Sequence, residues 1–514
     1  MQGTINFCII AVIVIYLLGM LAIGFKFSKR QSSSEDFYLG GRKMGPIVTA
    51  MSAEASDMSS WLLMGLPGVA YLSGISDAAW TAIGLGIGTW LNWYFVSRRI
   101  RLYSSHLGAI TVPEFYSKRF GDKKHILSAL AALVIVIFFI PYTASGFAAC
   151  GKLFNSLFGV NYMTAMVFSA VIIIGYTIMG GFSAVSTTDL VQSVVMSIAL
   201  VVVIGFGLSK SGGVGAVMDN AKSLPGFLDM FAMHDPVTGG ETPYSFITII
   251  STMAWGLGYF GMPHILVRFM AIEDDKKLAL SRRVGTVWVV IAMSAAIFIG
   301  IVGLGMTKAG NLPLLEGSAS ETVIVEISSL LSKNGIFPAM IAGLILAGIL
   351  AATMSTADSQ LLAAASSVSQ NIIQEFMGVK LSEKQSLLVA RITIIVISII
   401  GIFLAQDPNS SVFGIVSFAW AGFGGAFGAM TLCALFWKRT NLAGALAGVI
   451  SGGVTVFVWK YLVRPLGGIW NIYELLPAFI ISLVFTVAVS LMTKAPDASI
   501  VGDYDEVDKM CKKK

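Results

Sequence analysis

The stretch SAEASDMSSWLLMGLPG, residues 52–68, sets two acids and four serines in a largely apolar part of the chain. Glu54 and Asp57 are three residues apart, so their side chains share a face in a helix. Serine and aspartate compete for backbone hydrogen bonds, so a helix can open here and free its carbonyl oxygens. Carbonyl and carboxylate oxygens suit a small, hard cation. The alternative interpretation is a polar contact between packed helices.

A second polar cluster is AATMSTADSQ, residues 351–360. Ser355 and Ser359 are four residues apart and lie on one helix face, with Asp358 beside them. Their hydroxyls have lone pairs that a cation can use. Hydrogen bonds from the hydroxyls to their own helix would explain the serines and Thr356, but they would not explain Asp358.

A third stretch, WGLGYFGMP at residues 255–263, repeats Trp255, Tyr259 and Pro263 at intervals of four. Its glycines and proline disfavour a regular helix. We therefore predict a second broken helix whose aromatic rings could wall a small substrate; an ordinary aromatic packing stripe is the alternative. Asp189, in STTDLVQ, is a further acid at the start of an apolar segment. It could equally be a helix-start acid capped by Thr187 or Thr188.

The composition indicates which elements position these groups. Of 514 residues, 56% are hydrophobic and only 12% are charged, and the mean hydropathy is +0.81, as expected for a polytopic membrane protein. About 13 apolar segments can be counted, and we predict an all-α fold with these 13 spans. The segments are 5–25, 45–72, 78–96, 126–150, 161–180, 185–208, 244–262, 284–306, 335–360, 386–405, 411–436, 443–463 and 472–492.

The positive charges of the loops predict the orientation. Alternate loops, taken with the C-terminal tail, carry 26 of the 34 Lys and Arg residues, and one of them is the loop 263–283. By the positive-inside rule these loops are cytoplasmic, so the N-terminus lies outside and the C-terminus inside. We expect the tail from residue 494 to be disordered.

Several function classes lack their signatures. The chain has no Walker loop, no G-x-S-x-G and no H-E-x-x-H, so ATP-driven pumping and the common hydrolase mechanisms are not indicated. Asp57 and Asp189 could pose as an aspartyl pair, but no protease motif surrounds them. The four cysteines and four histidines form no ligand pattern. No basic domain could bind nucleic acid, and no obligate protein partner is expected.

The two predicted broken helices each open a group of five spans. Five is odd, so the second group enters the membrane in the opposite orientation, which is typical of secondary transporters with sites near the midplane. The predicted organisation is an N-terminal helix and basic loop (1–44), a first repeat (45–208), an extracellular loop (209–243), a second inverted repeat (244–436), two C-terminal helices (437–493) and a cytoplasmic tail (494–514).

Together with GGR at 40–42 and IPYTASG at 140–146, these stretches resemble the sodium/solute symporter family over nearly the whole chain. The resemblance implies a LeuT-like fold in a bacterial inner cell membrane. It also implies import of a small solute coupled to Na⁺, with L-proline as the expected substrate. Pantothenate, another amino acid or a sugar is the nearest alternative; a channel or a membrane sensor is a more distant one.

The resemblance also assigns residues. It implies a sodium site made by the carbonyls of Ala55, Met58 and Ala352 and the hydroxyls of Ser355 and Thr356. It implies a substrate pocket formed by Asp57, Ser59, Trp61, Tyr142, Trp255, Tyr259 and Pro263. Arg42 matches an arginine tied to coupling, and Asp189, Ser355 and Ser359 match a second ion site of some relatives.

Three residues depart from the family pattern. Glu54 and Ser60 stand where relatives have glycine, and Asp358 stands where others have an uncharged residue. We hypothesise that Asp358 strengthens the second ion site or binds a proton.

Overall fold

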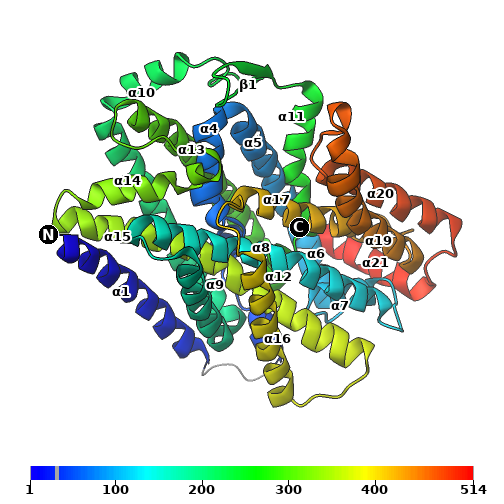
Figure 1. Cartoon of the computed structure of the whole chain (residues 1–514). Coiled ribbons are helices and arrows are strands. Elements are labelled where there is room, and N and C mark those ends of the chain that lie inside the picture. The colour runs from blue at the N-terminus through cyan, green and yellow to red at the C-terminus, as the bar shows by residue number, and fades with distance from the viewer. Residues whose placement is uncertain (1, 29–33, 513–514) are drawn as a thin grey trace.

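The computed structural model describes residues 2–28 and 34–512, and most of them are helical (Figure 1). The first half contains α1 (Gln2–Ser28), α2 (Ser34–Leu39), η1 (Gly40–Arg42), α3 (Pro46–Asp57), η2 (Trp61–Gly65), α4 (Leu66–Ser73), α5 (Ile75–Leu91), η3 (Asn92–Val96), α6 (Ser97–His106), α7 (Val112–Arg119), α8 (Ile126–Phe158), α9 (Tyr162–Lys210), α10 (Gly213–Lys222), β1 (Ala232–His234) and β2 (Glu241–Pro243).

The second half contains α11 (Phe246–Met253), η4 (Ala254–Gly261), α12 (Pro263–Ala271), η5 (Asp275–Lys277), α13 (Leu278–Lys308), η6 (Gly317–Thr322), α14 (Val323–Ser332), α15 (Ile336–Ser366), η7 (Ser367–Phe376), α16 (Glu383–Leu404), α17 (Val412–Phe423), η8 (Gly424–Gly428), α18 (Ala429–Phe436), α19 (Leu442–Val458), η9 (Trp459–Val463), η10 (Arg464–Leu466), η11 (Gly468–Trp470), α20 (Leu475–Met492) and α21 (Ala498–Lys512).

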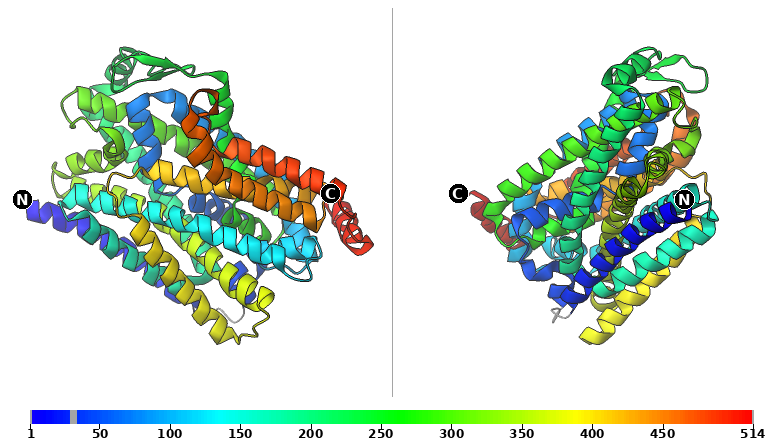
Figure 2. Two further views of the ribbon diagram at one scale, coloured as in Figure 1. Left: turned by 45° about the vertical axis from the view of Figure 1, so that its right-hand side comes forward. Right: turned by 90° about the vertical axis from the view of Figure 1, so that its left-hand side faces the viewer.

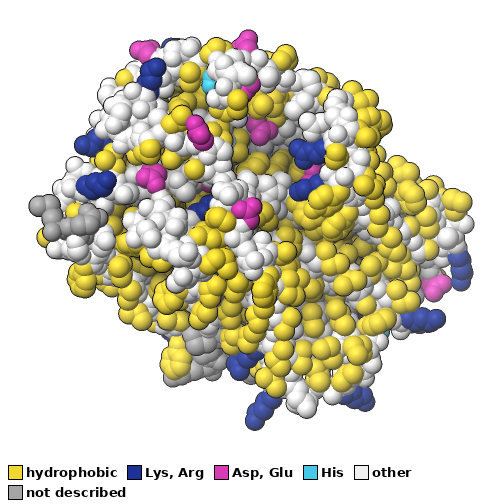
Figure 3. All heavy atoms as spheres, viewed as in Figure 1, with side chains coloured by type: hydrophobic (Ala, Val, Ile, Leu, Met, Phe, Trp, Pro, Cys, Tyr) yellow, Lys and Arg dark blue, Asp and Glu magenta, His cyan; other side chains and the backbone are white. Residues whose placement is uncertain are grey.

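The apolar helices are those of a membrane protein. Within the described residues, nine helices are long and apolar enough to cross a bilayer, and shorter apolar helices add to them. Breaks divide several predicted segments into shorter helices, so the count of 13 spans stays a prediction. Figure 3 shows a broad band of hydrophobic side chains on one face, with charged side chains gathered mainly toward its margins. Apolar side chains at such a surface are stable when they face lipid.

Both predicted helix breaks are confirmed. α3 ends at Asp57, and Met58 leaves helical geometry with φ −77° and ψ 69°; the chain then resumes through η2 into α4. In the second, α11 passes into the 3₁₀ segment η4, Met262 is extended, and α12 begins at Pro263. Proline fits the first helical turn because no helical partner is needed there for its missing N–H.

The breaks lie at the centre of the helix packing. α3 packs against α9, α13, α12 and α15, while α1 lies along α15 and α9. α19 and α20 form a hairpin on the side of the molecule opposite α1, and both pack on η8 (Figures 1 and 2). Between α9 and α11, α10 and the antiparallel pair β1–β2 cover one end of the bundle (Figure 2).

The C-terminal segment is a helix, so the expectation of a disordered tail is wrong within the described residues. Tyr504 and Val507 of α21 are buried, and Asp508 pairs with Arg99 of α6 at 2.8 Å. The apolar residues of α21 recur at helical spacing, and its acids meet a basic partner surface. That surface is formed by residues far from α21 in the chain, so it exists only in the folded protein.

Candidate functional site

The end of α3 meets the polar part of α15. The Ser355 hydroxyl donates to the carbonyl oxygen of Ala55 at 2.7 Å and to that of Ala352 at 3.1 Å. The Thr356 hydroxyl donates to the Ala352 carbonyl at 3.2 Å. Met58 is buried directly after the end of α3. The structure therefore brings most of the predicted sodium ligands into contact, and their role in binding sodium stays a prediction.

Asp57 connects the two helix breaks. The Tyr259 hydroxyl, from η4, donates to Asp57 Oδ2 at 2.5 Å. The Asp57 carbonyl oxygen accepts from Trp61 Nε1 at 3.0 Å and from the Tyr142 hydroxyl at 3.3 Å. In the described part of the chain, Asp57 Oδ1 is buried and has no hydrogen-bond partner. Such an oxygen is costly unless a ligand or proton satisfies it.

Aromatic rings surround this junction. The rings of Trp61 and Trp255 are 6.1 Å apart, and Phe413 and Tyr473 each lie 5.2 Å from Trp255. Trp420 Nε1 donates to the Trp255 carbonyl at 2.7 Å. We call Trp61, Tyr142, Trp255, Tyr259, Phe413, Trp420 and Tyr473 the aromatic cluster. The sequence did not single out the last three, because no motif surrounds them and their ring partners lie far away in the chain.

The remaining residues of the predicted substrate pocket, Ser59 and Pro263, lie at the edges of the aromatic cluster. Ser59, nearly buried, accepts from the Trp61 amide at 3.4 Å. Pro263 begins α12 and lines a cavity on the other side of the break, together with Tyr38, Thr111, Arg268 and Ser359 among others. This cavity therefore reaches the polar core from the end of the molecule where α2 and α7 lie.

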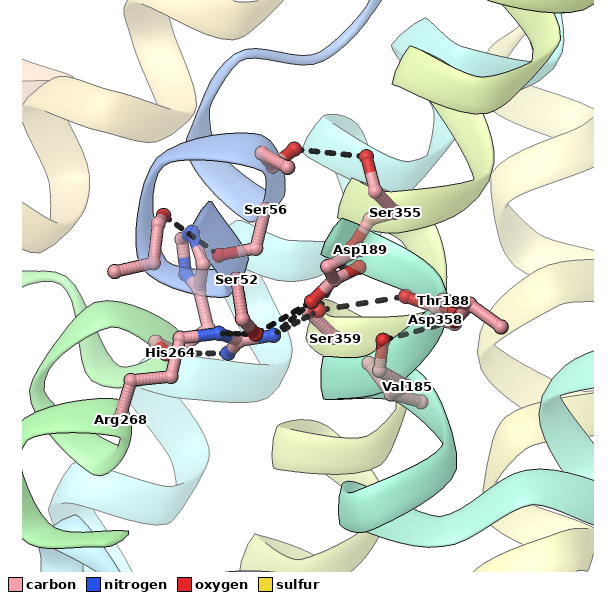
Figure 4. A network of polar contacts seen from close by, with 12 residues as sticks. Ser52, Ser56, Val185, Thr188, Asp189, His264, Arg268, Ser355, Asp358 and Ser359 are labelled. Atoms are coloured by element: carbon pink, nitrogen blue, oxygen red, sulfur yellow. Dashed lines mark hydrogen bonds and ion pairs between the residues drawn. The ribbon is translucent and has the colours of Figure 1, made fainter. Parts of the chain in front are cut away.

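The predicted second ion site contains an arginine (Figure 4). Arg268 of α12 donates to Asp189 Oδ2 at 3.0 Å, to the Ser359 hydroxyl at 2.6 Å and to the Ser52 hydroxyl at 2.7 Å. Ser52 in turn donates to Asp189 Oδ2 at 2.6 Å. These contacts join α3, α9, α12 and α15, and we call this group, with Asp358, the Arg268 cluster.

The structure corrects one alternative interpretation and one prediction. Asp189 is not a capped helix-start acid, because α9 continues through it and breaks earlier, at Gly181. The hydroxyls of Thr187 and Thr188 donate back to their own helix instead. Arg268 does not belong with the loop charges of 263–283, since it is 1% exposed. An arginine within the apolar run HILVRFMA was the signal that could have revealed it.

Asp358 is fully buried in the Arg268 cluster. Its Oδ1 accepts from the Ser359 hydroxyl at 3.3 Å, and within the described residues its Oδ2 has no hydrogen-bond partner. Within the described residues, the Arg268 guanidinium pairs with Asp189 and makes no ion pair with Asp358. A buried carboxylate at membrane depth is costly unless a cation or a proton compensates it, so a role of Asp358 in binding an ion or a proton stays a prediction.

Glu54 is buried, and its hydrogen-bond partner lies in η3. Its Oε1 accepts from Trp93 Nε1 at 2.7 Å, and the Trp93 ring lies 4.4 Å from the ring of Phe269 in α12. Glu54 therefore connects α3 to α12 through Trp93. This contact gives a structural role to a glutamate that stands where the family pattern has glycine.

Polar contacts also join helices on either side of the site, toward the two ends of the bundle. At one end, Arg42 donates to the carbonyls of Met270 at 2.8 Å and Ala109 at 2.6 Å. Burial lowers the pKa of Arg42 to about 10, which leaves it charged at neutral pH. At the other end, beyond the aromatic cluster, Lys152 pairs with Glu321 at 2.7 Å. Glu321 also accepts from the Phe413 amide at 3.1 Å.

Comparisons with known proteins show what this chain is similar to. The model of the sodium:solute symporter family matches residues 37–452. The sodium/proline symporter of Staphylococcus aureus is 39% identical over 509 residues, covering 98% of this chain and 96% of that protein. The protein of the same name from strain JH9 is also 39% identical, over 510 residues.

Solved structures show the fold. A Na⁺-coupled sialic acid symporter in a substrate-bound outward-open state matches with TM-score 0.78 and 22% identity, covering 96% of this chain and 99% of that chain. Mhp1, a nucleobase-cation-symport-1 family transporter in a closed conformation, matches with TM-score 0.54 and 13% identity, covering 92% and 99%. The predicted LeuT-like fold is confirmed.

Proposed function

Because this chain belongs to the sodium:solute symporter family, we propose that it imports L-proline together with sodium by alternating access. Its family consists of transporters, and its helices make it an integral membrane protein. We further propose that it lies in a bacterial cell membrane with its N-terminus outside and its C-terminus in the cytoplasm, as the loop charges predict.

The observation that carries the proposal is the hydrogen bond between Asp57 and Tyr259. It joins the two helix breaks at a point beside the predicted sodium ligands and the aromatic cluster. Broken helices that meet near the midplane supply free backbone groups for both an ion and a substrate. In this proposal Asp57, Ser59, Trp61, Tyr142, Trp255, Tyr259 and Pro263 contact proline.

The proposed cycle begins with sodium. The carbonyls of Ala55, Met58 and Ala352 and the hydroxyls of Ser355 and Thr356 bind the ion and fix α3 against α15. Proline then places its carboxylate near the free amides after α3 and its ring against Trp255, Tyr259 and Tyr142. Sodium drives the cycle only through its different affinity for the outward and inward states. In this proposal Arg42 acts in coupling, through its contacts near the end of α12.

The available energy is sufficient. One charge that crosses about 100 mV contributes about 2.3 kcal/mol. A roughly tenfold sodium gradient adds about 1.4 kcal/mol. Together they would sustain roughly 500-fold accumulation of proline.

The test is uptake of labelled L-proline into proteoliposomes under an inward sodium gradient, with an equal potassium gradient for comparison. Asp57→Asn removes the proposed acid, and Asp219→Asn makes the same change at an exposed position of α10. We expect sodium-dependent accumulation in the wild type and in Asp219→Asn but not in Asp57→Asn. Sodium binding without proline uptake would favour another solute, such as pantothenate, another amino acid or a sugar. Equilibration without accumulation would favour a channel, and binding without any flux a sensor.

A further inference from the structure

Tyr473 reaches the aromatic cluster from outside the two five-helix groups. It lies in the connection between α19 and α20. Its amide donates to the Ser251 hydroxyl of α11 at 2.6 Å, and its own hydroxyl donates to the Ser417 carbonyl of α17 at 2.6 Å. Both ends of this residue are therefore tied to helices of the second group.

The neighbouring residue anchors the connection. Glu474 is fully buried and pairs with Arg464 at 3.0 Å and with Lys460 at 3.7 Å. A buried carboxylate with two cationic partners holds its backbone firmly, because losing a partner would leave an uncompensated charge. Tyr473 thus has little freedom to move away from the cluster.

The ring of Tyr473 lies against a proposed substrate contact. It is 5.2 Å from the Trp255 ring, with an angle of 24° between the planes. An offset stack of this kind fixes the orientation of both rings.

We infer that Tyr473 is a positioning residue. By holding Trp255 in place, it sets the size of the substrate ring that the proposed pocket accepts. The inference rests on the proposed transport of proline and deepens it. With Trp255 unable to tilt outward, the pocket has a fixed depth. A pocket of fixed size discriminates against one additional methylene by about 10- to 200-fold.

The test compares L-proline with its six-membered-ring homologue, which has one methylene more. KM and kcat are measured for both in proteoliposomes with the wild type, Tyr473→Leu and Tyr473→Phe. Tyr461→Leu is the matched control, because Tyr461 lies on the same hairpin, is 60% exposed and is outside the cluster. We expect Tyr473→Leu to reduce the preference for proline at least tenfold, mainly through KM. Tyr473→Phe keeps the ring and should keep most of the preference.

The outcomes separate this inference from the proposed function. Absence of proline transport in the wild type would refute the proposed function. Proline transport with an unchanged preference in Tyr473→Leu, or an equal loss in Tyr461→Leu, would overturn the inference alone. Folding of each variant is checked by its sodium-induced tryptophan fluorescence change. If Tyr473→Leu does not fold, Tyr473→Met, which keeps a flexible apolar contact, replaces it.

Discussion

Two polar groups on α15 differ in the source of the positive charge that they bind. Ser355 and Thr356 face carbonyl oxygens, so the first group consists of neutral ligands. About one turn further, Ser359 and Asp358 belong to the Arg268 cluster, which contains its own cation. Neutral oxygens need an ion from solution, whereas a guanidinium is tethered and always charged. We therefore expect sodium to exchange readily at the first group, and the Arg268 cluster to hold four helices together.

The largest expected effect comes from removing the tethered cation. Arg268→Gln removes the cationic partner of the buried Asp189, so we expect a loss of about 3–5 kcal/mol of stability. The measurement is thermal unfolding in detergent, and Arg283→Gln, an exposed arginine of α13, is the control. An unchanged melting temperature would show that the cluster does not depend on its guanidinium, and the contrast between the two groups would fail.

A second test removes a neutral ligand. Thr356→Val keeps the shape and loses the hydroxyl, so we expect sodium affinity to fall by about 10- to 100-fold. Sodium titration of tryptophan fluorescence measures it. Thr353→Val is the control, since Thr353 lies on the same helix about one turn before Thr356, its hydroxyl donates to the Ile349 carbonyl, and it is not among the predicted sodium ligands. Equal sodium affinities in the two variants would remove Thr356 from the site.

A third test sharpens the comparison at Asp358. Asp358→Asn is isosteric and removes the carboxylate that Arg268 does not pair with. If this carboxylate strengthens a second ion site, we expect sodium binding to weaken by about 1 kcal/mol, roughly fivefold. Flux measurements should then also show a lower ion-to-solute ratio. Unchanged sodium dependence and stoichiometry would refute a role of Asp358 in ion binding.

The smallest effect is expected where the same type of ion pair lies near the surface. Hydrogen bonds from Lys512 and Arg99 hold the pKa of Asp508 below its ordinary value. This pairing therefore stabilises α21 at neutral pH, and the stabilisation is lost as pH falls through the lowered pKa. Asp508→Asn should cost less than about 1 kcal/mol and reduce the acid sensitivity of α21 to proteolysis. A loss as large as that of Arg268→Gln would show that burial does not explain the difference.

Part of the site could be predicted from local sequence. Serine and aspartate in 52–60, and glycine with proline in 255–263, act on their own backbone, so the breaks of α3 and before α12 follow from nearby residues. Arg268 was placed with the loop charges because its partners come from α3, α9 and α15. Tyr473 gave no signal, since it lies more than two hundred residues from Trp255 in the chain.

The sequence by itself determined the membrane environment, the helix breaks and the polar residues placed within apolar segments, because composition and backbone preference are local properties. Only the tertiary structure decided that a guanidinium pairs with Asp189, that Tyr473 backs Trp255 and that α21 docks on α6. These contacts join segments far apart in the chain, and the desolvation that gives them their strength exists only after the helices have packed.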